Sequence, residues 1–144
     1  MTYDRIDWHS GGDFPPDLKP ENGGTHIGMF LCWAIQNDLI GALHRELSQK
    51  SLEKVKERNM TGRDFLIEEC DSKFIDEDLN VEGNMFAKYY YGDETYKEYL
   101  NDYADIFDPY ETLYHVEDTW GNYDKIKPVI DKNYQEWKTI SADL

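Results

Sequence analysis

The sequence predicts a mostly α-helical protein, a single domain over residues 1–144 built as a bundle of six or seven short helices. An irregular N-terminal arm over residues 1–24 would pack on the core, with one short strand pair as an option. Three observations support this fold class. The length suits one ordinary domain. Apolar residues recur at helical spacing in several segments. A chain of this size buries enough surface to fold without disulfides or metal.

Glycine and proline pairs, such as Gly11-Gly12 and Pro15-Pro16, interrupt the first 24 residues. They indicate an ordered but irregular arm. The aromatic residues that would hold this arm to the core are Tyr3, Trp8 and Phe14.

Residues 26–37 are apolar on nearly every side, which predicts a buried central helix. A buried strand is the alternative, because a short apolar run does not separate the two. Thr25 would cap this helix, and Gly28 would mark close packing against a neighbour.

Residues 42–49 and 51–59 have the mixed charge of short exposed helices. The next helix, from about 61 to 69, has a fuller start signal. Thr61 would be its N-cap, with Asp64 three residues later and Met60 and Phe65 at the hydrophobic-staple positions.

Two further helices are predicted in the second half of the chain. One begins at residues 76–78 and ends at Gly92 and Asp93. It buries either Leu79, Phe86 and Tyr90 or Val81, Met85 and Tyr89. The other covers residues 94–107 and ends before Pro109. Its apolar stripe consists of Tyr96, Tyr99, Leu100, Tyr103, Ile106 and Phe107.

Residues 110–118 contain an alternating stretch, which favours an extended conformation. Pro128 suits the first turn of a last helix that runs to about Thr139. Ile130, Tyr134 and Trp137 would face the core.

The charge of the chain is strongly negative and unevenly distributed. Thirty acidic and fifteen basic residues give a formal net charge of −15. The block from Asp64 to Asp118 holds seventeen acids and three bases. This argues against direct binding of nucleic acid through phosphates and against a polybasic membrane surface. The block is either a solvated surface or an electronegative face for a basic partner.

The sequence favours a cytoplasmic protein. The longest apolar run, from Met29 to Ile35, is far shorter than the ~20 residues that span a bilayer. Residues 1–8 lack the basic and apolar regions of a secretory signal. Cys32 and Cys70 fit reduced thiols better than a disulfide scaffold.

Acidic residues gather on the helix predicted at 94–107. Like charges four residues apart destabilise a helix by about 0.2–0.5 kcal/mol per pair, and acids near its C-terminal end oppose the helix dipole. Since only Lys97 offsets them, the carboxylates are predicted to serve a partner. The alternative is a helix held so firmly by its aromatic stripe that its solvent side is unconstrained. The predicted partner-binding residues are Glu94, Glu98, Asp102, Asp105, Asp108, Tyr110 and Glu111.

Tyrosines adjoin these acids. Three consecutive ones, Tyr89, Tyr90 and Tyr91, cannot all point inward from one helix, so we expect at least one to be exposed. An exposed Tyr offers a large, rigid contact area with a polar tip.

Local motifs for catalysis, cofactors or metals are absent from the sequence. Two frames for a calcium loop, from Asp71 and from Asp76, fail at the position that requires glycine. Cys32 and Cys70 lie outside any zinc-ligand spacing, and the four histidines are scattered. We therefore expect no catalytic residue, no cofactor and no metal.

Four strings carry a resemblance: WHSGGDFPPDL (8–18), THIGMFLCWAI (25–35), MTGRDFL (60–66) and DEDLNVEGNMFAKYYY (76–91). Over roughly residues 3–103 the chain resembles a family of small bacterial proteins of unknown function. By size and charge, though not by motif, it is similar to the immunity proteins of polymorphic toxin systems, which act in competition between bacteria.

The leading hypothesis is therefore a non-enzymatic, immunity-type inhibitor of a basic toxin or effector domain, such as a nuclease. One alternative is a nucleic-acid mimic that blocks a DNA- or RNA-binding protein. Another is a small enzyme that uses His26 or Cys32.

Overall fold

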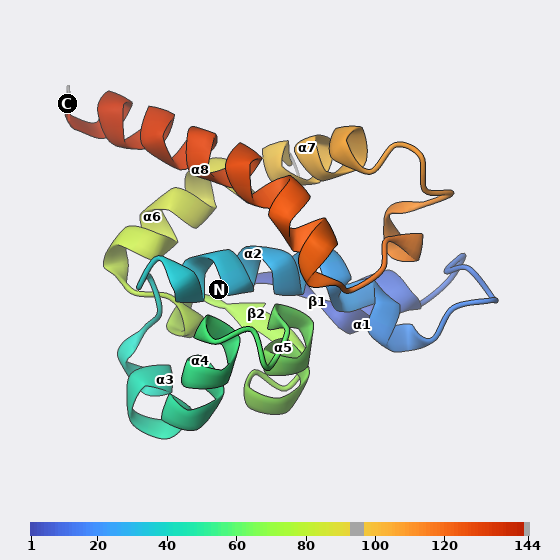
Figure 1. The fold of residues 1–144 in the computed structure, drawn as a ribbon, viewed down its shortest axis with the longest axis horizontal. Helices are drawn as coiled ribbons and strands as arrows, with labels where there is room; N and C mark the ends of the chain where they lie inside the picture. Colours follow the sequence, from blue (N-terminus) through green and yellow to red (C-terminus); the bar gives the residue numbers. More distant parts are fainter. Residues whose placement is uncertain (93–96, 143–144) are drawn as a thin grey trace.

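A computed structural model describes residues 1–92 and 97–142. Its central element is α2 (Thr25–Gln36), the helix predicted over 26–37, and nearly every side chain of α2 is buried. In Figure 1, α5 (Gly62–Glu69) lies below α2, while α7 (Glu98–Ile106) and α8 (Trp120–Ala142) lie above it. The mostly α-helical, single-domain prediction is confirmed, with a two-stranded sheet and eight α-helices among the described residues.

Two glycines let α2 and α5 approach closely. A Cβ at Gly62 would collide with the carbonyl oxygen of Gly28, and a Cβ at Gly28 would collide with the backbone of Arg63. Close packing at Gly28 is thus confirmed. Thr25 is not the N-cap, because Gly24 occupies that position. The Thr25 hydroxyl is buried and accepts a hydrogen bond from Nη1 of Arg63 at 3.1 Å.

The N-terminal arm is more regular than predicted. It contains β1 (Thr2–Arg5), α1 (Ile6–Ser10) and the 3₁₀ helix η1 (Pro20–Gly24). Strand β1 pairs antiparallel with β2 (Lys73–Ile75), with Thr2 opposite Ile75. A strand of four residues shows no clear alternation, and its partner lies some seventy positions away, so no local pattern reveals it.

Two of the three predicted anchors hold the arm. Tyr3 is buried, and the ring of Phe14 lies 5.0 Å from that of Tyr114. Trp8 is 57% exposed, so its predicted anchoring role is wrong. Trp8 lies on the solvent side of α1, whose single buried residue is Ile6.

The middle of the chain follows the predicted boundaries closely. It forms α3 (Ala42–Leu47), α4 (Gln49–Lys56) and α5. The N-cap of α5 is confirmed, because Oγ1 of Thr61 accepts the backbone N–H of Asp64 at 3.2 Å. Phe65 is fully buried, and Met60 packs against the core.

After the 3₁₀ helix η2 (Asp76–Asp78), α6 (Val81–Tyr90) buries the first of its two predicted faces. Phe86 and Tyr90 are fully buried, whereas Val81 and Met85 are exposed. The Phe86 ring lies within 6.1 Å of several other aromatic rings, which form the centre of the core. These partners are Phe30, Trp33, Tyr90, Tyr134 and Trp137.

Helix α7 buries Tyr99 and Tyr103, as its stripe predicts, while Ile106 is exposed. The first predicted turn of this helix, including Glu94 and Tyr96, lies outside the described residues. Residues 110–118 are not extended, because the 3₁₀ helix η3 (Leu113–His115) bends them. Oγ1 of Thr112 caps η3 by accepting the N–H of Tyr114 at 3.1 Å.

Helix α8 begins eight residues before Pro128, so the predicted start is wrong. Oγ1 of Thr119 accepts the N–H of Asn122 at 3.1 Å, which supplies the cap that the sequence analysis missed. Pro128 interrupts one hydrogen bond inside the helix. The buried side chains of Ile126, Ile130, Tyr134 and Trp137 hold both halves against the core. No helix in the described part of the chain has the length and apolarity to cross a bilayer.

Candidate functional site

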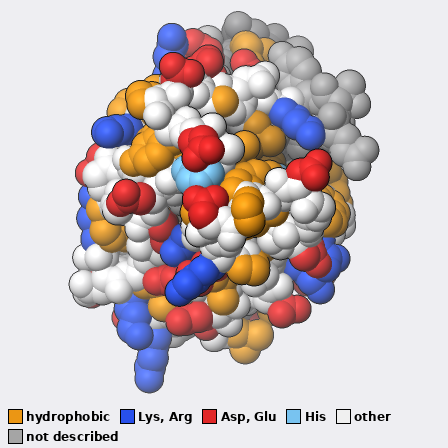
Figure 2. Space-filling model, turned by 90° about the vertical axis from the view of Figure 1, so that its right-hand side faces the viewer, with side chains coloured by type: hydrophobic (Ala, Val, Ile, Leu, Met, Phe, Trp, Pro, Cys, Tyr) orange, Lys and Arg blue, Asp and Glu red, His pale blue; other side chains and the backbone are white. Residues whose placement is uncertain are grey.

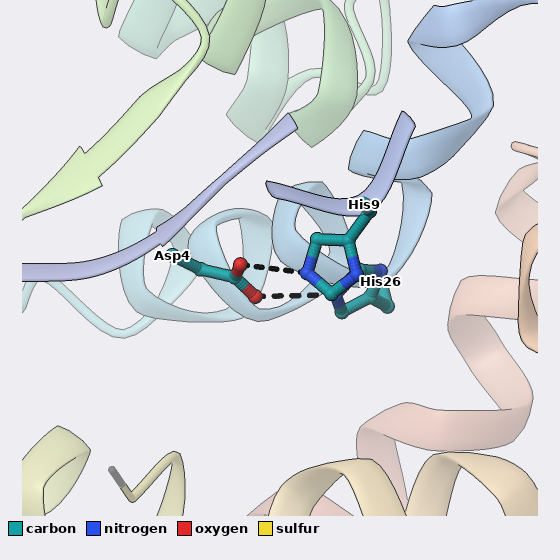
Figure 3. Close-up of side chains that lie close together, drawn as sticks. All are labelled: Asp4, His9 and His26. Atoms are coloured by element: carbon teal, nitrogen blue, oxygen red, sulfur yellow. Dashed lines mark hydrogen bonds and ion pairs between the residues drawn. The ribbon is translucent and has the colours of Figure 1, made fainter. Parts of the chain in front are cut away.

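The carboxylate of Asp4, the third residue of β1, accepts four hydrogen bonds. Oδ1 accepts the backbone N–H of Arg5 at 2.9 Å and Nε2–H of His9 at 2.7 Å. Oδ2 accepts Nε2–H of His26 at 3.2 Å and the hydroxyl of Tyr91 at 2.5 Å. Figure 3 shows the two imidazoles on the same side of the carboxylate. Four donors use the full capacity of an ionised carboxylate, so Asp4 ties β1, α1, α2 and the end of α6 together.

Burial and hydrogen bonding set the charges at this site. Burial opposes ionisation of Asp4, but the hydrogen bonds from His26 and His9 outweigh it and hold the pKa of Asp4 far below its usual range. Complete burial lowers the pKa of His26, which keeps that ring neutral near pH 7. Burial also raises the pKa of Tyr91, so its hydroxyl stays protonated and donates to Asp4.

Tyr114 extends this network to η3. Its hydroxyl lies 2.8 Å from Nδ1 of His9, within hydrogen-bond distance, while Nε2 of the same ring faces Asp4. One residue further, Nε2 of His115 lies 3.0 Å from Oδ2 of Asp17. Together with the contact between Phe14 and Tyr114, these bonds fasten the N-terminal arm to η3.

The fastening brings together two segments that lack Lys and Arg, residues 6–18 and 98–124. They meet at the right-hand end of the molecule in Figure 1, where the blue arm lies beside the orange loop after α7. Figure 2, which faces this end, shows acidic side chains next to hydrophobic ones, with basic side chains interspersed. We call this surface the acidic end. Asp7 and Asp124 are exposed too but pair with Arg5 and Arg58 outside these segments. The remaining exposed carboxylates, which define the acidic end, are Asp13, Asp17, Asp105, Asp108, Glu111 and Glu117.

The predicted partner-binding residues fall into three groups. Asp105, Asp108 and Glu111 are exposed and belong to the acidic end. Glu98 and Tyr110 are half-buried, and the Tyr110 hydroxyl accepts from Asn122 at 3.2 Å. Two residues remain, Asp102 and Glu94, and Glu94 lies outside the described residues.

The carboxylate of Asp102 has partners within the fold. Its Oδ2 accepts the hydroxyl of Tyr90 at 2.7 Å and Nδ2–H of Asn133 at 3.3 Å. Asp102 therefore joins α7 to α6 and α8, so this carboxylate has a role within the fold. Of the three consecutive tyrosines, only Tyr89 is exposed, at 38%, which confirms that one of them faces outward.

The acidic block of residues 64–118 does not form one face. Helix α5, which carries acids of this block, lies on the opposite side of α2 from α7, which carries others (Figure 1). Asp78 is buried beside His44, and Asp118 accepts a hydrogen bond from Thr61. The surface that the fold creates draws instead on residues 98–118 and on the arm, whose acids lie outside that block.

A cleft of about 650 Å³ opens beside Asp4. It is bordered by β1, α1 and the start of α7, and its lining includes Tyr3, Trp8, His9, Tyr91 and Lys97. His26 and Cys32, the pair considered for an enzyme, have different surroundings. His26 contacts Asp4, whereas Cys32 lies near Gly62 and Tyr123. Burial raises the pKa of Cys32 to about 12, which disfavours a thiolate nucleophile.

Sequence reasoning did not single out Asp4, Tyr91 or Tyr114 as functional. They are separated by 87 and 23 residues and belong to three elements, so no periodicity connects them. The sequence does contain one signal for the acidic end: two separate segments, residues 6–18 and 98–124, lack Lys and Arg.

The neutral state of His26 makes stability depend on pH. In the unfolded chain this imidazole has a pKa of about 6.5, and its folded pKa is lower. Below about pH 6.5 the unfolded state therefore binds a proton that the folded state excludes. We expect the free energy of unfolding to fall as the pH drops from 7 towards 5.

Urea unfolding across this pH range measures the effect. The substitution His26→Gln is expected to reduce the slope, because it removes the buried imidazole that the folded state keeps neutral. An unchanged slope in the His26 variant would show that other groups cause the pH dependence.

Fold and surface together define a small, mostly helical domain whose two basic-residue-free segments form an acidic end. The chain belongs to the family described as Domain of unknown function (DUF7832), whose model matches residues 2–116. The matched range includes the Asp4 network and all of the acidic end except Glu117, and it stops before α8. No curated protein and no solved structure matches the chain.

Proposed function

We propose that this protein is an immunity-type inhibitor that binds a basic toxin or effector domain, such as a nuclease, through the acidic end. One observation carries the proposal: the Asp4 network holds two segments without Lys or Arg against each other. The exposed carboxylates of both segments then act at one end of the molecule. A basic partner would meet this negative potential before contact, which accelerates association.

The rigidity of this surface supports a binding role. Its two segments are joined mainly through buried or half-buried groups, and among the exposed carboxylates only Asp17 takes part, through His115. Most of those carboxylates thus stay free for a partner. Loops already held in place lose less conformational freedom when a partner binds. The neighbouring half-buried rings, Phe14, Tyr110 and Tyr114, add contact area of the kind that dominates protein interfaces.

Charge neutralisation tests the location of the site. The four-fold variant Asp17→Asn, Asp105→Asn, Asp108→Asn and Glu111→Gln removes four exposed charges from the acidic end. A matched control, Glu53→Gln, Glu57→Gln, Asp64→Asn and Glu68→Gln, removes four exposed charges from α4, its C-cap and α5. The partner would be the basic protein that co-purifies with the wild-type chain, and titration calorimetry at several salt concentrations would give its affinity.

We expect the acidic-end variant to lose about 10–100-fold in affinity at low salt and to depend less on salt, while the control stays near wild type. Equal losses in both variants would mean that net charge alone matters and would remove the acidic end as the site.

Addition of DNA or RNA separates a nucleic-acid mimic from an inhibitor. Displacement of the chain by nucleic acid would favour the mimic, and inhibition of the partner without displacement would favour the inhibitor.

A further inference from the structure

Three side chains far apart in the sequence meet beneath α3. His44 comes from α3, Cys70 follows the last turn of α5, and Asp78 ends η2. Nε2 of His44 lies 2.7 Å from Oδ1 of Asp78 and 3.6 Å from Sγ of Cys70. His44 and Asp78 are buried, and Cys70 is half-buried. One imidazole nitrogen thus faces both a carboxylate and a thiol.

We propose that His44, Cys70 and Asp78 bind a divalent transition-metal ion of the zinc type, with solvent as the fourth ligand. Thiolate, imidazole and carboxylate are the groups that Zn²⁺ prefers, and three protein ligands leave one tetrahedral position open. The proposal is independent of the acidic end and of any partner.

The distances suit such an ion with small movements. Zn–S and Zn–N bonds of about 2.3 and 2.0 Å at a tetrahedral angle separate sulfur and nitrogen by about 3.5 Å. The His44–Cys70 distance of 3.6 Å is already close to that value. The His44–Asp78 distance would have to open from its hydrogen-bonded 2.7 Å by about half an ångström.

The remaining polar atoms of the ligands already have partners. Nδ1 of His44 lies 3.0 Å from Oγ of Ser48, a hydroxyl that can accept a hydrogen bond from Nδ1–H once Nε2 binds the ion. Oδ2 of Asp78 accepts the backbone N–H of Ile75 at 2.8 Å, which orients the carboxylate. Binding would break the Cys70 S–H bond and form a metal–sulfur bond. The neutral His44 ring would lose its Nε2 proton and carry one on Nδ1 instead, so one proton in total is released to solvent.

The cluster of Asp4, His9 and His26 has a comparable set of atoms but suits an ion less well. The carboxylate of Asp4 is saturated by four donors. If Nε2 of His26 bound an ion, Nδ1 would carry the proton, and no described residue accepts it. A buried donor without an acceptor is costly, whereas His44 has Ser48 at this position.

Cobalt substitution tests the proposal and separates the two clusters, because only one of them contains sulfur. The full chain would be titrated with Co²⁺ under reducing conditions and followed by absorption spectroscopy, with Zn²⁺ as the competitor. We expect one ion per chain and a thiolate-to-cobalt charge-transfer band that Zn²⁺ removes. The band should persist in Cys32→Ser, the matched control at the second free cysteine, and disappear in Cys70→Ser.

Three results would overturn the proposal. The first is a folded wild-type chain that shows no charge-transfer band. The second is a band that persists in Cys70→Ser or disappears in Cys32→Ser. The third is Co²⁺ binding without a sulfur signal, which would place the ion at oxygen and nitrogen ligands elsewhere.

Far-ultraviolet circular dichroism confirms that each variant is folded. If Cys70→Ser does not fold, alkylation of Cys70 in the wild-type chain replaces it, and Zn²⁺ should slow that reaction.

Discussion

Replacement of Asp4 by alanine is expected to lower the free energy of unfolding by about 3–5 kcal/mol, the range for removing one partner from a buried charged network. The change would leave the donors of His9, His26 and Tyr91 without their shared acceptor. Each buried donor that loses its partner costs about 1–3 kcal/mol. Urea unfolding at pH 7 measures the loss.

A neighbouring carboxylate provides the control for this prediction. Asp7 is exposed and pairs with Arg5 on the same arm, at 2.6 Å. Exposed pairs contribute about 0–1 kcal/mol, so Asp7→Asn should have little effect. If Asp4→Ala were as mild as Asp7→Asn, the Asp4 network would not be what holds the arm.

Introduction of a methyl group at Gly62 is expected to be the second strongly destabilising change. The new Cβ of Gly62→Ala would meet the backbone carbonyl of Gly28 and the Cβ of Cys32. Because the first contact is backbone, no rotamer change relieves it, and α2 and α5 must separate. We expect a loss of about 3 kcal/mol or more, at the upper end of the range for overpacked cores.

Gly121 serves as the matched position for the same substitution. It lies near the start of α8, and its Cβ would have its nearest neighbour 4.0 Å away, at Oγ1 of Thr119. Alanine in a helix is favoured over glycine by up to about 1 kcal/mol, so Gly121→Ala should leave stability unchanged or increase it. Thermal unfolding of both variants gives the comparison. Similar melting temperatures would contradict a close α2–α5 contact.

Much of the fold could be predicted from the sequence because local patterns determine it. The apolar run of α2, the Thr61 cap and the stripe carrying Tyr99 and Tyr103 each depend on residues within a few positions of one another. The sequence allowed one short strand pair without locating it, and the early start of α8 was missed. The strand pair depends on a contact across the chain. The early start depends on a cap at Thr119, which was overlooked because Pro128 offered a more familiar start signal.

The candidate sites were harder to predict for the same reason. Net charge along the sequence indicated acids between residues 64 and 118, but the fold separates α5 from α7. The fold also brings Asp13 and Asp17 of the arm to the acidic end, and these two acids lie outside the block of residues 64–118. The cluster of His44, Cys70 and Asp78 spans 34 residues and three elements, so no ligand spacing could show it.

Hydrogen exchange of the complex tests most directly whether the acidic end is the binding surface. Amide exchange would be compared between the free chain and the chain bound to its co-purifying basic protein. We predict that protection on binding concentrates in residues 10–18 and 105–117 and is small in α4 and α5. Protection concentrated in α4, α5 or the outer face of α6, with the acidic end unchanged, would contradict the proposed mode of binding.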